Sequence, residues 1–235
     1  MIKYIEYYHT IDSTIDLAEK YIKEQKYDDH FLIRADIQTN ARGRKGNEWD
    51  SGLDGLWFNI GLNHISKQKS FTIFIGICIL NSLIELTHCQ EFKIKWPNDI
   101  YLYDKKICGI ICSQFIQYHK INIGIGINTN NDKPPIKKAD SIKNLLNLEL
   151  KNDVYLHMIL KTIFNTIGDF EKFGIDMFAD LYKKYDYLVN QKIKVTSGKE
   201  TLEGYYKGIN SDGELLIKDC KNITQIINSG EIIIL

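Results

Sequence analysis

The sequence Lys-Trp-Pro-Asn-Asp at residues 95–99, followed by Lys-Ile-Cys-Gly-Ile at residues 106–110, decides the fold of this chain. A given five-residue string arises by chance in 235 residues with a probability on the order of 10⁻⁴. Pro97 fixes the chain at a strand end, so that Asn98 and Asp99 present polar groups at a sheet edge; an ordinary Asn-Asp turn is the competing interpretation. A lysine on entry to a buried strand, followed by a glycine that permits close backbone approach, suits a phosphate centre.

Upstream, residues 38–49 read Gln-Thr-Asn-Ala-Arg-Gly-Arg-Lys-Gly-Asn-Glu-Trp, and this segment is called the Arg loop below. The chain has 30 basic residues, but only Arg34, Arg42 and Arg44 are arginine, which suggests that arginine persists where lysine cannot replace its planar, bidentate grip. A glycine-punctuated loop with several cations would become ordered over an anionic ligand. A solvated basic turn is the alternative, weakened by the scarcity of arginine and by the presence of Trp49.

Downstream, Gly-Ile-Gly-Ile-Asn at residues 124–128 predicts an apolar strand with room for a flat ligand and an amide at its end. By itself it is also compatible with a buried strand and turn. No Gly-x-x-x-x-Gly-Lys-Ser/Thr loop occurs, and Gly124-x-Gly126 lacks the third glycine of a dinucleotide fingerprint. The phosphate chemistry therefore does not belong to either of those two classes.

The amino-acid composition also excludes several classes of protein. Lys+Arg and Asp+Glu each total 30, which argues against a protein held on nucleic acid or an anionic membrane by bulk charge. A hydrophobic content of 44% excludes wholesale disorder, and no run of eighteen apolar residues predicts a membrane span. No leader sequence is evident at the N-terminus, and the five cysteines are scattered, which predicts reduced thiols in a cytoplasm and no structural zinc.

Hydrophobic periodicity predicts two regions that meet near Leu188. Short β-rich runs separated by glycine turns at residues 188–235 predict a small SH3-like barrel. Residues 1–187 alternate between expected strands and helices. The expected strands are Tyr4–Tyr8, Phe31–Ala35, Leu56–Leu62, Phe92–Trp96, Lys106–Phe115 and Ile121–Ile127. A first helix is expected after Asp12 or Ser13, either of which can cap it, and the further expected helices are Phe71–His88, Val154–Phe173 and Ile175–Tyr187.

These motifs occur in the order found in biotin protein ligases, and the resemblance runs from about Tyr4 to Leu235. The pairing of Arg-Gly-Arg-x-Gly with Lys-Trp-Pro-Asn-Asp is highly specific. The resemblance implies an α+β fold, with a mixed β-sheet and helices of the biotin/lipoate ligase type at residues 1–187 and an SH3-like domain at residues 188–235. Because the chain begins directly on the catalytic strand, it looks like the monofunctional type, without the N-terminal DNA-binding domain of larger members.

The resemblance also implies roles for individual residues. Ser13 and Thr14 have a second explanation, because hydroxyls at a helix start are first of all caps. The implied biotin-binding residues are Ser13, Thr14, Gln38, Arg42, Arg44, Lys106 and Gly109. The implied ATP and adenylate residues are Asn98, Lys106, Asn128 and Trp49. The implied catalytic residues are Lys106, Arg42, Arg44 and Asp99, of which Asp99 also helps to position the acceptor lysine.

The implied reaction activates biotin with MgATP as biotinyl-5'-AMP and then transfers it to a lysine of a biotin carboxyl carrier domain of a biotin-dependent carboxylase. Magnesium arrives with ATP, so no protein metal site is expected, nor a nucleic acid or membrane partner. The sequence leaves a homodimer open, because family members are often dimers. Two departures concern the Arg loop: Ala41 stands where glycine is usual, which penalises a positive φ, and Asn47 where arginine is common.

Three rival interpretations remain at this level. Lipoate and octanoate transferases share the scaffold but handle a flexible acyl chain. A nucleic-acid-binding regulator would use the basic loop and the barrel, against which the zero net charge counts. A catalytically dead carrier-binding protein is disfavoured because every central motif is present.

Overall fold

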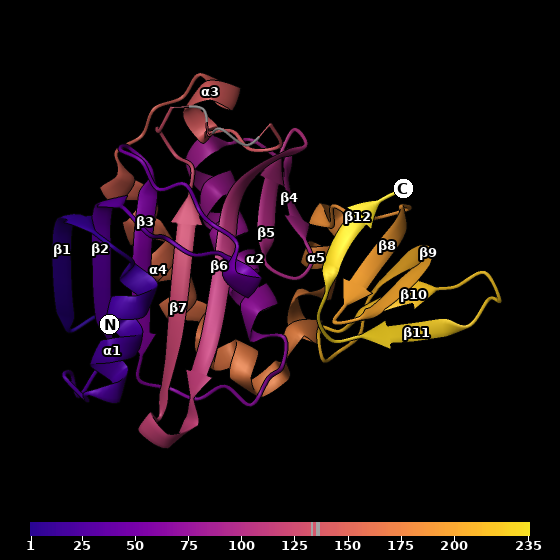
Figure 1. Ribbon diagram of the computed structural model, residues 1–235, viewed down its shortest axis with the longest axis horizontal. Helices are drawn as coiled ribbons and strands as arrows, with labels where there is room; N and C mark the ends of the chain where they lie inside the picture. The colour runs from indigo at the N-terminus through magenta and orange to yellow at the C-terminus, as the bar shows by residue number, and fades with distance from the viewer. Residues whose placement is uncertain (133, 135–136) are drawn as a thin grey trace.

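The computed structural model describes residues 1–235 except 133, 135 and 136, and it shows a mixed sheet with helices followed by a smaller antiparallel sheet (Figure 1). The large sheet has the order β1-β2-β3-β7-β6-β5-β4, in which β1 pairs with β2 in parallel and every other pair is antiparallel. Its strands are β1 (Tyr4–Ile11), β2 (Phe31–Gln38), β3 (Leu56–Leu62), β4 (Phe92–Lys95), β5 (Asp99–Leu102), β6 (Lys105–Phe115) and β7 (Lys120–Ile127).

Helices cover the two faces of this sheet. On one face, α1 (Thr14–Lys23) contacts β2, β3 and β7; on the other, α2 (Phe71–Thr87) contacts β4, β5 and β6 and packs on α4 (Asn152–Phe173). The alternation of side chains along β6 shows the division, because Gly109 faces the indole of Trp49 whereas Ile110 reaches Gly76 of α2. The remaining helices are α3 (Ile142–Leu146) and α5 (Ala179–Tyr185), with 3₁₀ turns η1 (Arg44–Gly46), η2 (Ile116–Tyr118) and η3 (Ile175–Phe178).

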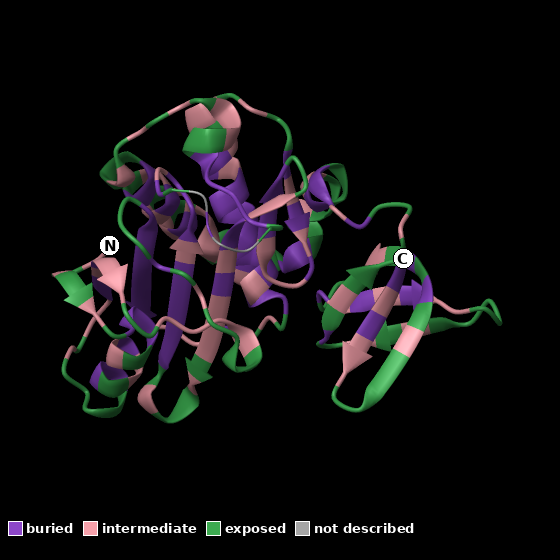
Figure 2. Ribbon diagram, turned by 45° about the horizontal axis from the view of Figure 1, so that its top comes forward, coloured by how far each residue is buried: buried purple, intermediate pink, exposed green. Residues whose placement is uncertain are grey.

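The helices begin and end where their local sequence allows. Ser13 caps α1 by accepting a hydrogen bond from the Asp16 backbone N–H at 3.2 Å. Helix α2 is buried along most of its length, which matches its nearly continuous apolar sequence, and it ends at His88 in the left-handed conformation. Strands β3 and β7 in the middle of the sheet are buried along nearly their whole length, whereas much of β6 is only half-buried (Figure 2).

The smaller sheet comprises β8 (Lys192–Ser197), β9 (Glu200–Ile209), β10 (Leu215–Lys218), β11 (Thr224–Ile227) and β12 (Glu231–Ile234). Its order, β11-β10-β9-β8-β12, is antiparallel throughout. The expected C-terminal β domain is confirmed, but its described strands do not close into a barrel, because the two edge strands β11 and β12 are not paired with each other.

The core runs from one sheet into the other. Leu188, Ile193 and Leu215 of the C-terminal region belong to the same buried cluster as the side chains between the large sheet and α2. At this junction Trp96, which is buried, donates from its indole Nε1 to the Gly213 carbonyl oxygen at 2.9 Å. In the described part of the chain, the helices are all too short or too polar to cross a lipid bilayer.

Candidate active site

A cavity of about 330 Å³ runs across the large sheet from β2 to β4. Thr14 and Gln38 line one end, and residues 230–233 of β12 and the turn before it line the other. Between these ends lie the Arg loop, Gly124 and Gly126 of β7, Lys106 and Gly109 of β6, Asp99 of β5 and Lys95 of β4. The strand order therefore sets the order of the polar groups along the cavity.

The two hydroxyls at the start of α1 have different surroundings. Ser13 serves as the N-cap and does not line the cavity in the described structure. Thr14 does line it, and its backbone N–H and its Oγ1 both donate to Gln38 Oε1, at 2.8 and 2.9 Å. Gln38 Nε2 donates in turn to Ser51 Oγ at 3.1 Å, which fixes the orientation of the Gln38 amide. The polar groups of Thr14 and Gln38 are therefore preorganised at this end of the cavity.

The Arg loop folds back on itself through its backbone. Arg42 and Glu48 form an antiparallel bridge, and the Trp49 N–H donates to the Ala41 carbonyl oxygen at 3.0 Å. The positive φ angles lie at Lys45 (55°) and Gly46 (78°), not at Ala41. The alanine that stands in place of the usual glycine is therefore accommodated without left-handed backbone in this conformation.

Three cations of the Arg loop contact three different elements. Arg42 donates from Nε to Asp16 and from Nη2 to Glu19, both at 2.6 Å and both on α1. Although burial lowers the pKa of Arg42, these two carboxylates raise it above its ordinary value.

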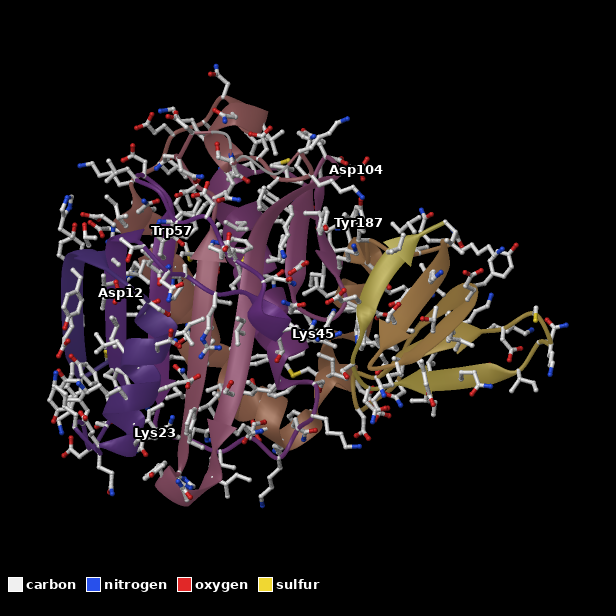
Figure 3. The ribbon with its side chains drawn as sticks, in the orientation of Figure 1. Asp12, Lys23, Lys45, Trp57, Asp104 and Tyr187 are labelled. Atoms are coloured by element: carbon white, nitrogen blue, oxygen red, sulfur yellow. The ribbon has the colours of Figure 1, made fainter. Side chains whose placement is uncertain are left out.

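The other two cations reach the far end of the cavity. Arg44 donates to Asn98 Oδ1 at 2.7 Å, and Lys45 Nζ lies 3.6 Å from Glu231 Oε1. In Figure 3, Lys45 lies in front of the large sheet on the side that faces the C-terminal sheet. The loop thus spans the cavity from α1 to β12.

Trp49 lies over the middle of the sheet. A Cβ atom at Gly109 would be 2.9 Å from the indole, and one at Gly126 would be 2.7 Å from its Nε1. Both glycines are therefore required for the ring to lie flat on β6 and β7. Lys106 Nζ lies 5.1 Å from the centre of the same indole, a cation–π distance.

Lys106 and Asp99 form an ion pair inside the cavity, with Nζ and Oδ1 2.9 Å apart. The side chains are 29% and 19% exposed, so the pair is partly shielded from water. Asn98 is held between two groups, because it accepts from Arg44 and donates from Nδ2 to the Ile110 carbonyl oxygen at 3.0 Å. This arrangement places cations where an anionic ligand would contact them.

Asn128 behaves differently from the other expected site residues. It is 3% exposed, accepts a hydrogen bond from Asn131 Nδ2 at 3.2 Å, and does not line the cavity in the described structure. The structure thus brings Thr14, Gln38, Arg42, Arg44, Trp49, Asn98, Asp99, Lys106 and Gly109 together around one cavity, whereas Ser13 and Asn128 do not line it.

Two contributions to the cavity do not appear among the expected site residues. Lys95 lines it and donates to the Ile232 carbonyl oxygen at 3.3 Å, and residues 230–233 form its far wall. Lys95 belongs to the five-residue string that decides the fold, so that string carried the signal. The wall has no local signal, because it lies 137 residues further along the chain.

Three carboxylates line this cavity, those of Glu48, Asp99 and Glu231. Asp99 is paired with Lys106, and Glu231 with Lys45. Across the described residues, no group of three or more His, Cys, Asp or Glu side chains has the arrangement of a metal site.

Comparison with known proteins agrees with this geometry. The model of the "Biotin/lipoate A/B protein ligase family" matches residues 7–130, and that of the "Biotin protein ligase C terminal domain" matches residues 188–235. Because the first match covers more than half of the chain, the chain belongs to the biotin/lipoate A/B protein ligase family.

Similar proteins point to the biotin branch of that family. The bifunctional ligase/repressor BirA of Bacillus subtilis is 25% identical over 234 residues, which are 94% of this chain and 72% of the relative. That of Escherichia coli is 25% identical over 221 residues, 88% of this chain and 67% of the relative. Biotin–protein ligase 2 of Arabidopsis thaliana is 26% identical over 204 residues, 83% of this chain and 56% of the relative.

Solved structures give the same fold. A biotin protein ligase from Aquifex aeolicus, in complex with biotin and ATP, superposes with a TM-score of 0.85 at 25% identity and covers 100% of this chain and 99% of that one. A ligase from Leishmania major, with a TM-score of 0.70, 19% identity and coverage of 97% and 100%, shares the fold.

Proposed function

We propose that this chain activates biotin with MgATP, forming biotinyl-5'-AMP and pyrophosphate, and then transfers the biotinyl group to a lysine of a biotin carboxyl carrier domain. The observation that carries the proposal is the single cavity in which fixed polar groups at one end and lysine and arginine side chains at the other face one space. Its setting in a biotin ligase family chain, similar to an Aquifex enzyme solved with biotin and ATP, supports biotin as the acid.

The first step must bring two anions together. A carboxylate oxygen of biotin forms a bond to the α-phosphorus of ATP, and the bond between that phosphorus and the β-phosphate oxygen breaks, which releases pyrophosphate. Lys106 and Arg44 lie where they would offset the repulsion and stabilise charge on the phosphoryl oxygens. Thr14 and Gln38, with their fixed hydrogen bonds, would hold the uncharged part of biotin.

The second step needs an uncharged amine. The amine nitrogen of the carrier lysine attacks the carbonyl carbon of the mixed anhydride, an amide forms and AMP leaves. Asp99 lines the cavity and pairs with Lys106, and we assign it to the positioning of that lysine once Lys106 has shifted toward phosphate. The Arg loop would cover the adenylate and keep water out.

The remaining expected site residues differ in whether they line the cavity, and their proposed roles differ accordingly. We assign Trp49 and Asn98 to the nucleotide because both line the cavity, and Gly109 to close contact beneath the ligand. Ser13 would act through the capping of α1, and Arg42 through the attachment of the loop to α1. The assignment of Asn128 to adenine rests on the family resemblance alone, since Asn128 is buried and does not line the cavity.

The proposal extends to the setting of the protein. The partner is the carrier domain of a biotin-dependent carboxylase, the compartment is the cytoplasm, and a homodimer through the catalytic domain is compatible with it. We place the boundary between the catalytic domain and the C-terminal domain at residues 187 and 188. Magnesium enters as part of the substrate MgATP.

The test mixes purified protein, biotin, MgATP and a carrier domain and follows the intact mass of the carrier. A biotin-sized increase on one lysine, with pyrophosphate release that depends on biotin, is the expected result. Lipoate and octanoate, offered separately, test the other branch of the family, and faster pyrophosphate release with either would overturn the assignment to biotin. A gel shift with DNA tests the regulatory alternative.

A further inference from the structure

The cations of the cavity differ in what they contact. Arg42, Lys45 and Lys106 each lie against a carboxylate. In the described structure, Arg44 and Lys95 meet only uncharged acceptors, the Asn98 amide oxygen and the Ile232 carbonyl oxygen. At the end of the cavity next to β12, Arg44 and Lys95 therefore carry two positive charges that form no direct ion pair with a carboxylate among the described residues.

Lys95 is held in an unfavourable place for a lone ammonium group. Its side chain is half-buried, and burial lowers its pKa, with Lys106 adding repulsion and Asp99 opposing both effects. Its only hydrogen bond in the described structure is the 3.3 Å contact to Ile232, and its Nζ lies 5.3 Å from the centre of the Tyr101 ring. A bound anion would accept charged hydrogen bonds from Lys95 and so replace the contacts with water that the ammonium group loses on burial.

The sheet order indicates which anion fits. In a displacement at phosphorus, the attacking and leaving oxygens lie on opposite sides of the phosphorus atom. If the acid lies toward Thr14 and Gln38, the leaving group points to the opposite end of the cavity. That end is formed by β4, the edge strand of the large sheet, and by β12. Lys95 is the last residue of β4, and its ammonium group contacts Ile232 of β12.

We propose that Lys95 binds the β- and γ-phosphates of ATP, which leave as pyrophosphate, and that its ammonium moves from the Ile232 carbonyl oxygen to this ligand. The proposal rests on the proposed function and assigns a subsite to it. The bond between the α-phosphorus and the bridging oxygen breaks with its electron pair on the pyrophosphate, and Lys95 stabilises that charge. The contact with Ile232 means that β12 positions this lysine before the nucleotide arrives.

The experiment compares Lys95→Met with Lys93→Met. Lys93 lies on the same strand and also donates to a backbone carbonyl oxygen, that of Lys184 at 3.2 Å, but outside the cavity. Binding is measured by calorimetry in the presence of biotin, with AMP and with an ATP analogue whose α–β bridge cannot be cleaved. Lys95→Met is expected to weaken the analogue by roughly tenfold to a hundredfold and AMP by less than threefold, because a charged hydrogen bond to the phosphates is lost. Lys93→Met is expected to change neither affinity.

Kinetics of the two half-reactions provide the second readout. Lys95→Met should raise the KM for pyrophosphate in the reverse conversion of biotinyl-5'-AMP to ATP by a similar factor. Transfer of biotin from added biotinyl-5'-AMP to the carrier, which involves no pyrophosphate, should stay within about twofold. Lys95→Arg should restore most of the pyrophosphate affinity.

Two results would overturn the proposal. One is equal weakening of AMP and the analogue; the other is a parallel loss in both half-reactions with a lowered melting temperature in both Lys95 variants, which would indicate a structural tie between β4 and β12. The failure of the proposed function looks different, because wild-type protein would then form no adenylate from biotin at all.

Discussion

In the proposed reaction, Lys106 is the residue on which the chemistry depends most directly. It contacts Asp99 at 2.9 Å and the face of Trp49, and it begins the stretch of β6 that carries Gly109. One side chain therefore connects the carboxylate, the indole and the strand beneath the ligand. Its neighbour Lys105 has the same charge, yet its Nζ donates to the Lys137 carbonyl oxygen outside the cavity.

Under the proposed function, replacement of Lys106 by alanine would remove one preorganised donor from the phosphoryl oxygens. We expect Lys106→Ala to lower the rate of biotin-dependent pyrophosphate release by roughly 10²–10³. Lys105→Ala is the matched control and should retain activity. Adenylation by Lys106→Ala within twofold of wild type would refute the role of this lysine.

A substitution at Gly126 tests whether the close packing of the Trp49 indole on β7 contributes to nucleotide binding. An added Cβ would lie 2.7 Å from the indole Nε1, so Gly126→Ala must displace the ring or the strand. We expect about a tenfold loss of nucleotide affinity by isothermal titration calorimetry, because stacking on an aromatic ring is worth on the order of 1–3 kcal/mol per base. Gly168→Ala, whose Cβ meets nothing within 4 Å, should leave the affinity unchanged.

At the scale of elements, the carboxylate of Glu6 on β1 connects this strand to α1. Glu6 accepts hydrogen bonds from Tyr21 at 2.9 Å and Lys26 at 2.6 Å, and from Tyr8 and Tyr27. Burial of the carboxyl group raises its pKa, but these donors more than reverse the effect and lower the pKa from 4.5 to about 2. The contact keeps the edge strand on the helix that also carries Thr14.

This pKa predicts how stability depends on pH. Because the pKa of Glu6 is lower in the folded chain, its contribution is present above about pH 4.5 and is lost as the pH falls toward 2. Glu6→Gln should lower the free energy of unfolding by about 2 kcal/mol at pH 7, and the deficit should shrink at pH 3. Urea denaturation at both pH values measures this.

A suitable control is Glu24→Gln, which removes an exposed pair with Lys20 four residues away. It should cost no more than about 0.5 kcal/mol at either pH. An equal deficit for Glu6→Gln at pH 7 and pH 3 would contradict the assignment of the effect to ionised Glu6.

The elements also show what a sequence can and cannot predict. Helix α2 was predictable because its apolar run is too long for a strand, and the observed bounds differ from the expected ones by one residue. Strand β5 was missed because Ile100–Leu102 is a short apolar run between two turns, and periodicity cannot identify so short a segment. The Arg loop motif marks the cavity, but its partners on α1 and β12 are brought there by the tertiary fold alone.

At the scale of the whole molecule, the junction between the two sheets contains a buried carboxyl group. Asp186 is 8% exposed, forms a bridge to Ile94 of β4, and accepts from the Leu188 N–H at 2.9 Å. Burial raises its pKa from 3.8 to about 6, although hydrogen bonds from Tyr206 and Leu188 oppose the rise. The charged form is therefore disfavoured at the point where the chain passes into the C-terminal sheet.

The sign for Asp186 is opposite to that for Glu6. Its stabilising contribution is complete below about pH 3.8 and is lost as the pH rises through 6. Asp186→Asn, which keeps an oxygen for Leu188, should be more stable than wild type at pH 8 by on the order of 2 kcal/mol, with little difference at pH 4. Thermal unfolding across this range measures it.

Asp169→Asn on the exposed face of α4 is the control, and its effect should stay within about 0.5 kcal/mol throughout. Parallel stability profiles for wild type and Asp186→Asn between pH 4 and pH 8 would rule out burial of this carboxyl group as the cause.

The three tryptophans lie in three different parts of the molecule, namely the cavity, the core of the large sheet and the junction of the two sheets. Trp49 lies over the glycines of the cavity, Trp57 is fully buried with its Nε1 bonded to the Gly52 carbonyl oxygen at 2.8 Å, and Trp96 joins the two sheets. The ring centroids of Trp49 and Trp57 lie 6.4 Å apart, so their emission is coupled in the intact chain; under the proposed function, the three rings would respond to ligand occupancy, core integrity and interdomain contact. With two tryptophans at a time replaced by phenylalanine, the emission of the third would follow one of these events in real time without an attached dye.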